Sequence, residues 1–347
     1  MIDFRYHLVS LISVFLALAV GIVLGAGPLK EPIGDSLQSQ VDALRTDRDN
    51  LRTELDAERA SVEELNQFVV ASAPELLAES LTDAEVAIVG SPGADADALT
   101  ALDERLSEAG AEVVMQVSLA ETALDPEGAG ELIETLRGID PSLPDGAAEA
   151  LTTALGRALT AGAGDPAAGG GDEPAEEAQA GSDTAPGTPE PTGTEAPADA
   201  GPTVYTADQA AEVVTAFSDD GRLTGSEYAA AGSVMFVAPP AAETPAEAEA
   251  TESTAPPQSE SDSVGATFAT ALAAGAPTVV TGTRASAERG LLSALRSDDS
   301  GITTADGLEV SAGPVIAALA LEQAIAGNPG AFGFADNAQS VVPGVEQ

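Results

Sequence analysis

The sequence contains no cysteine and no tryptophan, one histidine (His7) and three methionines, of which Met115 and Met235 are internal. Without cysteine the chain can form no disulfide, no thiolate zinc site and no thiol nucleophile. Thiolate, thioether and imidazole groups are the ligands that soft metals prefer, and they are nearly absent here. His7 lies four residues after Asp3, where capping or pairing explains it better than metal binding. The composition predicts no metal site.

Basic residues are also scarce, with 13 Lys and Arg against 57 Asp and Glu and a formal net charge of -44. This charge would repel nucleic-acid phosphates and anionic lipid head groups, so we expect neither as a partner. A large surplus of one sign keeps an exposed domain soluble.

One long hydrophobic run stands out, at residues 8–29. It carries no charge, and as a helix rising about 1.5 Å per residue it can cross the roughly 30 Å hydrocarbon core of a bilayer. The run is too long for the apolar part of a cleaved signal peptide, so we predict an uncleaved transmembrane helix. Arg and Lys are balanced on its two sides. The terminal amine then favours residues 1–7 in the cytoplasm and the chain after about Lys30 outside it.

Small residues recur every four positions in this run, at Ser13, Ala17, Gly21 and Gly25. Such a stripe lets two membrane helices approach closely, which predicts a face for helix packing. Glycine and alanine are also simply common in membrane helices, and the two interpretations stay open.

A heptad pattern follows at residues 34–72, with apolar residues at alternating steps of four and three. The positions are Leu37, Val41, Leu44, Arg48, Leu51, Leu55, Glu58, Val62, Leu65 and Val69. This regularity predicts a coiled-coil stalk that ends before Pro74, in preference to one amphipathic helix lying on its own domain.

Two polar residues interrupt the heptad pattern, Arg48 at an a position and Glu58 at a d position. A parallel homodimer would place Arg48 against Arg48, which is unfavourable unless the side chains turn outward. A different partner with opposite charges at these two positions would relieve both residues. The sequence therefore favours a partner protein, and a homo-oligomer is the alternative.

The rest of the chain, residues 80–334, alternates strands and helices, beginning with a strand at 85–90, a helix capped by Asp95 and a strand at 112–117. A strand, a helix and a second strand in this order form a parallel pair, so we predict a Rossmann-like α/β domain with a parallel sheet. Further helices are expected around 132–136 and at 147–159, 207–217, 264–274, 286–295 and 314–326, and further strands at 233–237, 278–281 and 302–304.

Two acidic tracts, residues 164–202 and 239–262, are rich in Ala, Gly, Pro, Thr and Glu and are expected to be disordered insertions in this domain. Residues 335–347 are expected to form a C-terminal tail. The first strand ends in the turn Gly90-Ser91-Pro92-Gly93-Ala94. This turn lacks the G-x-G-x-x-G spacing, so we expect no dinucleotide cofactor.

Candidate catalytic groups are few. Gly282-Thr283-Arg284 follows a strand and could hold an anion, and Asp83, Asp95 and Asp306 could act as acids. No nucleophile and base stand in a recognisable pattern, so we expect no enzyme and no catalytic residue. Met115 and Met235 lie in predicted buried strands and are expected to fill the core.

The opening sequence MIDFRYHLVSLISVFLALAVGIVLG resembles the N-terminal signature of the actinobacterial MctB family, named after mycobacterial copper transport protein B. Further similar segments are the heptad stalk, Ser91-Pro92-Gly93-Ala94, Ala109-Gly110-Ala111, Val280-Thr281-Gly282, Leu291-Leu292, Leu295-Arg296, Ala305-Asp306 and the 314–326 helix. The resemblance covers nearly the whole chain except the two acidic tracts.

This resemblance implies a membrane protein linked to copper homeostasis, acting in copper efflux or as a channel in the outer envelope. Some members of the family are similar to a division-linked partner of a thiamine-pyrophosphokinase-like membrane protein that acts on cell-wall hydrolysis. The strands are continuous apolar runs flanked by helices, which do not predict a transmembrane barrel. Two functions therefore stay open, copper transport and a cell-envelope scaffold that works through its coil.

Overall fold

A computed structural model describes residues 4–25, 30–163, 204–241, 260–298 and 300–344. The chain divides into two compact units, residues 1–65 and residues 66–347, and we call the second unit the head. The predicted acidic tract at 164–202 lies outside the described residues, as do residues 26–29 of the predicted span.

The first helix, α1 (Phe4–Gly25), confirms the predicted apolar N-terminal helix. Within it, Arg5–Gly25 is long and apolar enough to cross a membrane. Its large apolar side chains, such as Leu16 and Ile22, are exposed to solvent. A helix that is apolar on every side is stable where its side chains are surrounded by lipid or protein and not by water.

The second helix, α2 (Lys30–Leu77), is 48 residues long and differs from the predicted 34–72 stalk at both ends. Pro32 lies in its first turn, where a backbone N–H would have no hydrogen-bond partner within the helix, so the missing N–H of proline costs nothing. The helix also continues through Pro74, so the predicted end before this proline is wrong. Ala73 and Leu77, on either side of Pro74, are fully buried in the head, and this packing offsets the lost hydrogen bond.

The head contains a seven-stranded sheet in the order β3-β2-β1-β4-β5-β6-β7. Its strands are β1 (Glu85–Gly90), β2 (Glu112–Leu119), β3 (Leu223–Gly225), β4 (Ser233–Val237), β5 (Thr278–Gly282), β6 (Thr303–Asp306) and β7 (Ala331–Phe332). All neighbouring strands are parallel except β2 and β3. The predicted parallel α/β domain is confirmed, whereas the short edge strands β3 and β7 were not predicted.

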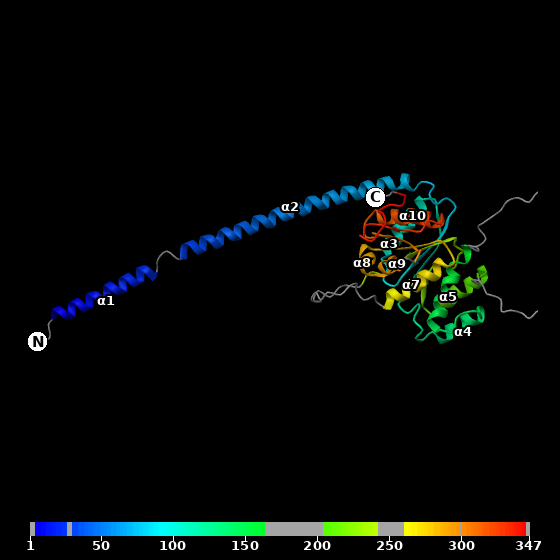
Figure 1. The fold of residues 1–347 in the computed structure, drawn as a ribbon, viewed down its shortest axis with the longest axis horizontal. Coiled ribbons are helices and arrows are strands. Elements are labelled where there is room, and N and C mark those ends of the chain that lie inside the picture. Colours follow the sequence, from blue (N-terminus) through cyan, green and yellow to red (C-terminus); the bar gives the residue numbers. More distant parts are fainter. Residues whose placement is uncertain (1–3, 26–29, 164–203, 242–259, 299, 345–347) are drawn as a thin grey trace, which may run out of the picture. The chain divides into compact units, whose positions relative to one another are not determined.

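Helices cover both faces of this sheet (Figure 1). One face packs against α3 (Ala96–Glu108), α10 (Gly313–Ile325) and the last turns of α2. The other packs against α4 (Gly130–Ile139), α5 (Ala147–Leu159), α6 (Ala207–Asp219), α7 (Glu260–Ala273), α8 (Arg284–Arg289) and α9 (Leu291–Ser297). In β1, Val86 and Ile88 belong to the first core and Ala87 and Val89 to the second, because successive side chains of a strand point to opposite faces.

Three predicted boundaries in the head are wrong. Residues 242–259 of the acidic tract expected at 239–262 lie outside the described residues, and its predicted end is wrong, since α7 begins at Glu260 and Asp262 is buried. The helix expected at 286–295 is two helices, because Gly290 has an extended backbone. The expected tail at 335–347 belongs to the head as far as it is described: Ala335 is buried, and the Gly333 amide donates to the Ser340 carbonyl at 3.0 Å.

Two threonines of β5 allow a matched test of this core. Thr281 is fully buried, and its hydroxyl has no hydrogen-bond partner among the described residues. The hydroxyl of Thr278, also buried, donates to the Ala276 carbonyl at 2.9 Å. We expect Thr281→Val to leave the free energy of unfolding unchanged or to raise it, and Thr278→Val to lower it by about 1 kcal/mol. Urea unfolding of the full-length protein in detergent measures both, and an equal loss would contradict this description of Thr281.

Candidate functional site

The small residues Ser13, Ala17, Gly21 and Gly25 lie at four-residue steps along α1. An added Cβ at Gly21 or Gly25 would meet nothing within 4 Å, so no described part of the chain covers these positions. The Ser13 hydroxyl donates to the Val9 carbonyl at 2.8 Å and therefore needs no polar partner in a membrane. Close helix packing on this face stays a prediction.

The apolar residues of the predicted coil are exposed in the single chain. Val41, Leu44, Leu51, Leu55, Val62 and Leu65 are 40–67% exposed. Leu37 also belongs to α2, and its side chain lies outside the described residues. We call the row of a and d positions from Val41 to Leu65 the seam. A helix that leaves six large apolar side chains in water has a surface that pairing with another helix would bury.

Val69, the last residue of the predicted coil, departs from the seam. It is half-buried and packs against the core that contains Ala73 and Leu77. The head therefore covers part of Val69, and its contact with a partner stays a prediction. Sequence spacing alone could not separate the two roles, since both use the same helical period.

The polar interruptions of the seam have different surroundings. The Arg48 guanidinium donates to one carboxylate oxygen of Asp49 through Nε at 3.0 Å and Nη2 at 2.7 Å. Asp49 is the next residue and lies outside the seam. The Arg48 side chain therefore turns toward Asp49 and away from the seam. At exposed sites such pairs contribute at most about 1 kcal/mol. Glu58 lies in the seam beside Arg59, which pairs with Asp56 at 3.7 Å.

A cavity of about 650 Å³ opens at the carboxyl ends of β1, β2 and β4. In open parallel sheets this end, where the chain order reverses, is the usual place for ligands. Its lining includes Ser91, Phe236 and Phe268 and contains no Lys or Arg among the described residues, so it offers no positive charge for a phosphate group. The buried Ser91 hydroxyl has no hydrogen-bond partner in the described part of the chain.

One wall of this cavity is fastened by Arg222, which sequence reasoning missed. Its guanidinium is 5% exposed and donates to the carbonyls of Thr122, Asp125 and Glu127. Asp220 accepts from the Arg222 Nε at 2.5 Å. A planar guanidinium with five donors can satisfy several carbonyls at once, and this holds the loop after β2 in place. No pattern in the sequence signals this contact, because the two segments are about 100 residues apart.

Asp306, a candidate acid, pairs instead with Arg296. The carboxylate is fully buried, the guanidinium is 4% exposed, and their closest atoms are 2.9 Å apart. Arg296 also donates to the carbonyl of Phe332 at 2.8 Å and to Asn337 at 2.8 Å, and Asp306 accepts from the amide of Phe334 at 2.7 Å. Burial lowers the pKa of Arg296, and Asp306 offsets part of this effect. This network holds the C-terminal segment against β6.

The other candidate catalytic groups are engaged in local structure. Asp95 caps α3 by accepting from the Asp97 amide at 2.9 Å, as predicted. Asp83 lies before β1 with a φ of 62°. Thr283 caps α8, and the Arg284 amide donates to the Glu309 carboxylate at 3.1 Å. The loop that could hold an anion therefore already holds a carboxylate of the same chain, and the three acids are not brought together.

A second buried network, also missed from the sequence, is centred on Asp140 between α4 and α5. Asp140 accepts from Arg157 at 2.7 Å, from the Tyr205 hydroxyl at 2.9 Å and from Ser142 at 2.6 Å. Burial acts to raise the pKa of Asp140, but the hydrogen bonds from Ser142, Tyr205 and Arg157 together outweigh it and lower the pKa. Arg157 precedes and Tyr205 follows residues 164–203, which lie outside the described residues. The network therefore joins the segment before these residues to the segment after them.

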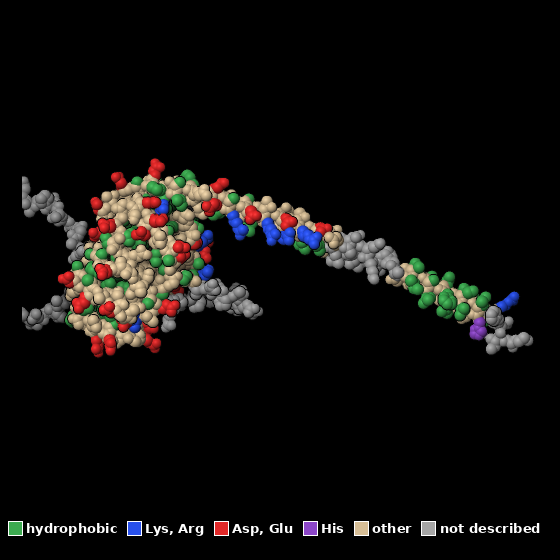
Figure 2. Space-filling view, turned by 180° about the vertical axis from the view of Figure 1, so that it is seen from behind, with side chains coloured by type: hydrophobic (Ala, Val, Ile, Leu, Met, Phe, Trp, Pro, Cys, Tyr) green, Lys and Arg blue, Asp and Glu red, His purple; other side chains and the backbone are tan. Residues whose placement is uncertain are grey.

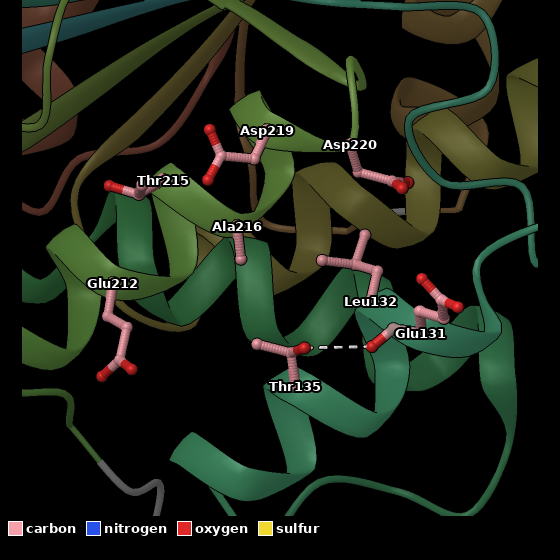
Figure 3. A pocket seen from close by; sticks show the side chains of 8 residues that line it. All are labelled: Glu131, Leu132, Thr135, Glu212, Thr215, Ala216, Asp219 and Asp220. Carbon is pink, nitrogen blue, oxygen red and sulfur yellow. Dashed lines mark hydrogen bonds between the residues drawn. The ribbon is translucent and has the colours of Figure 1, made fainter.

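A hollow of about 560 Å³ between α4 and α6 carries acidic side chains (Figure 3). Figure 3 shows that Glu131, Glu212 and Asp219 point in different directions around it. Asp220 is paired with Arg222 at 2.5 Å. Among the described residues, no three His, Cys, Asp or Glu side chains lie close enough together to hold a metal ion.

The methionines lie apart. Met115 is buried in the core beneath α4 to α9 and Met235 in the core on the other face of the sheet. His7 is in α1. The interpretation of both methionines as core residues is confirmed, and the soft ligands that copper prefers are not gathered at one place in the described chain.

The apolar N-terminal helix, the long polar helix with its seam and the parallel-sheet head define a membrane-associated α/β protein. Residues 1–343 match the model of the family described as "Copper transport outer membrane protein, MctB", and the chain belongs to this family. Relatives named "Copper transporter MctB", from Mycobacterium bovis and two strains of Mycobacterium tuberculosis, are 32% identical over 132 residues. The alignment covers 38% of this chain and 42% of the relatives, so less than half of their length is matched.

The Arg296–Asp306 pair makes a prediction about the head. We expect Arg296→Met to lower the free energy of unfolding by about 3–5 kcal/mol, because it leaves the Asp306 charge buried without its partner. The matched control is Arg284→Met, which removes an exposed pair with Glu288 at 3.0 Å and should cost less than about 1 kcal/mol. Denaturant unfolding of the two full-length variants compares them. Equal losses would mean that the buried pair does not fasten the C-terminal segment.

Proposed function

We propose that this chain is a single-pass protein of the cell membrane that serves copper homeostasis by holding a partner through α2. The observation that carries this proposal is the seam, whose six large apolar side chains are exposed along α2. Exposed apolar surface of this extent on a regular heptad indicates a helix-pairing surface. Membership of a copper transport family supplies the process that the pairing serves.

The arrangement of possible ligands supports a role in holding a partner over direct conduction of copper. Copper(I) prefers sulfur and copper(II) prefers nitrogen ligands. Met115 and Met235 are buried on opposite faces of the sheet, and His7 belongs to the apolar helix α1. The carboxylates of the described head are spread over its surface or paired with arginines (Figure 2). Such groups can bind divalent ions only loosely and without selectivity.

The membrane topology in this proposal places residues 1–7 in the cytoplasm and the head outside it. Among the described helices, the one that is both long and apolar enough to span a membrane is at the N-terminus, and the chain beyond it is strongly acidic. Arg5 and the terminal amine lie before the span, and positively charged ends are retained inside. The head then needs no disulfide to persist outside, since its sheet is buried on both faces.

A second candidate function is a cell-envelope scaffold that regulates division or cell-wall hydrolysis through the same seam. A thiamine-pyrophosphokinase-like membrane protein is the partner that the family resemblance implies for it. The seam favours this candidate as much as the first, because a pairing surface does not itself specify the process. In both, we propose that the chain acts by binding and not as an enzyme, and the engagement of Asp95, Asp306 and Thr283 in caps or ion pairs supports this.

The proposed topology predicts that protease added to intact spheroplasts removes the head and leaves a membrane fragment containing α1. The acidic surface of the head is then the accessible part of the chain. A cytoplasmic marker protein that stays uncut serves as the control for intact cells. Full protection of the head, with cleavage only after permeabilisation, would reverse the orientation.

The seam predicts the outcome of a complementation test. In cells that lack the gene, Leu51→Asp with Leu55→Asp should fail to restore copper tolerance, because charges at both positions prevent apolar pairing. The matched control is Thr53→Asp with Ala57→Asp, which adds the same charge on the outer face of α2 and should restore it. Both variants must reach the membrane in equal amounts. Full complementation by the seam variant, with loss in a variant of Met115, Met235 or His7, would contradict the proposal in favour of a metal mechanism.

A further inference from the structure

We infer that the partner of α2 is a second copy of this chain, paired with the first in parallel and in register along the seam. The inference rests on the proposed function, in which α2 holds a partner, and it names that partner. It is carried by the charged residues on either side of the seam, which become two defined rows only because α2 is one continuous helix.

Basic side chains border the seam on one side. Arg45, Arg52 and Arg59 are seven residues apart and each follows a d position, so they occupy one edge of α2, which we call the basic edge. Figure 2 shows Lys and Arg side chains gathered along one side of this helix. Asp47 and Glu54, also seven residues apart, each precede an a position and form the acidic edge on the other side of the seam.

In a parallel pair of helices, the residue before an a position faces the residue five places later on the other helix. Asp47 would then face Arg52 of the second copy, and Glu54 would face Arg59 of the second copy. Each contact occurs twice by symmetry. Asp47, Arg52 and Glu54 form no ion pair with one another or with other described residues of the single chain, so they are available for contacts between copies.

An antiparallel pair would bring like charges together. It places the basic edge of one helix against the basic edge of the other and the acidic edge against the acidic edge. Like charges at such positions are destabilising, so the two edges select the parallel arrangement. Anchoring of both copies in one membrane requires the same direction. In each copy α2 begins five residues after the end of α1. Anchoring of both copies in the same membrane therefore also favours the alignment of the two α2 helices in register.

The two polar residues of the seam no longer argue against identical helices. Arg48 already turns to Asp49 of its own chain, which reduces the repulsion between two copies of Arg48. Glu58 at a d position would lie beside Arg59 of the second copy. The seam ends at Leu65, because Val69 packs on the head. About three and a half heptads are therefore available for pairing.

A single engineered thiol tests this arrangement, since the chain has no cysteine of its own. In the full-length protein in membranes, Leu51→Cys should form a disulfide between two copies under mild oxidation, because a parallel pair in register brings identical d positions together. Ala60→Cys lies on the outer face of α2 and is the matched control. We expect at least tenfold more dimer from Leu51→Cys than from Ala60→Cys. Equal amounts, or none from either, would overturn the inference.

Charge reversal tests the contact between the edges. In the Leu51→Cys background, Arg52→Glu should weaken association about tenfold, equal to about 1.4 kcal/mol, because Asp47 of each copy then faces a like charge. Adding Asp47→Arg restores the opposite charges and should restore the disulfide-linked dimer. Ala60→Glu on the outer face should change it little. If Asp47→Arg weakens the dimer further instead of restoring it, these two residues do not face each other and the inference is wrong.

The two proposals fail in different ways. If Leu51→Asp with Leu55→Asp abolishes copper tolerance but Leu51→Cys forms no dimer of this chain, α2 holds a different protein and only the inference of a second copy falls. If Leu51→Cys forms the dimer but the seam variant complements fully, the second copy is the partner and the proposed function falls. The head core is untouched by all these substitutions, because residues 47–60 are exposed.

Discussion

A long helix with a narrow apolar stripe gains little stability by itself in water, and this constraint governs the molecule. Isolated helices are only marginally stable in water, and helices in proteins owe most of their stability to the burial of an apolar face. In α2 the last turns satisfy this requirement inside the head, where Ala73 and Leu77 are fully buried. The large apolar side chains of the preceding turns, from Val41 to Leu65, are exposed among the described residues. The interpretation of α2 as a pairing element follows from that difference along one helix.

The head obeys the same requirement in a different geometry. Its parallel strands are buried on both faces, so side chains such as Met115 and Met235, which could otherwise bind a soft metal, fill the two cores. Buried carboxylates such as Asp306, which pairs with Arg296, and Asp140, which pairs with Arg157, hold neighbouring segments in place. This chain belongs to a copper transport family, yet its internal methionines serve as core residues. For this reason we assign the partner-binding role to α2.

The two edges of α2 link this physics to assembly. A seam alone would accept many helices, since apolar contact is not directional. Opposite charges in two rows restrict the choice, as Asp47 and Arg52 complement each other only between parallel helices. Arg48, which in the sequence argues for a different partner, turns to Asp49 in the structure. Its position in the heptad was evident from the spacing, whereas its direction depended on a neighbouring side chain.

The sequence by itself determined the local elements. The apolar run, the strand at 85–90, the Asp95 cap and the α/β order follow from periodicity and capping within a few turns of chain, and the structure confirms each of them. The tertiary structure alone decided which candidate residues stay available. Val69 joins the head, Asp306 pairs with Arg296, and residues 335–344 pack as part of the head. These outcomes depend on contacts between segments distant in the chain, and local spacing carries no information about which side chains meet across a fold.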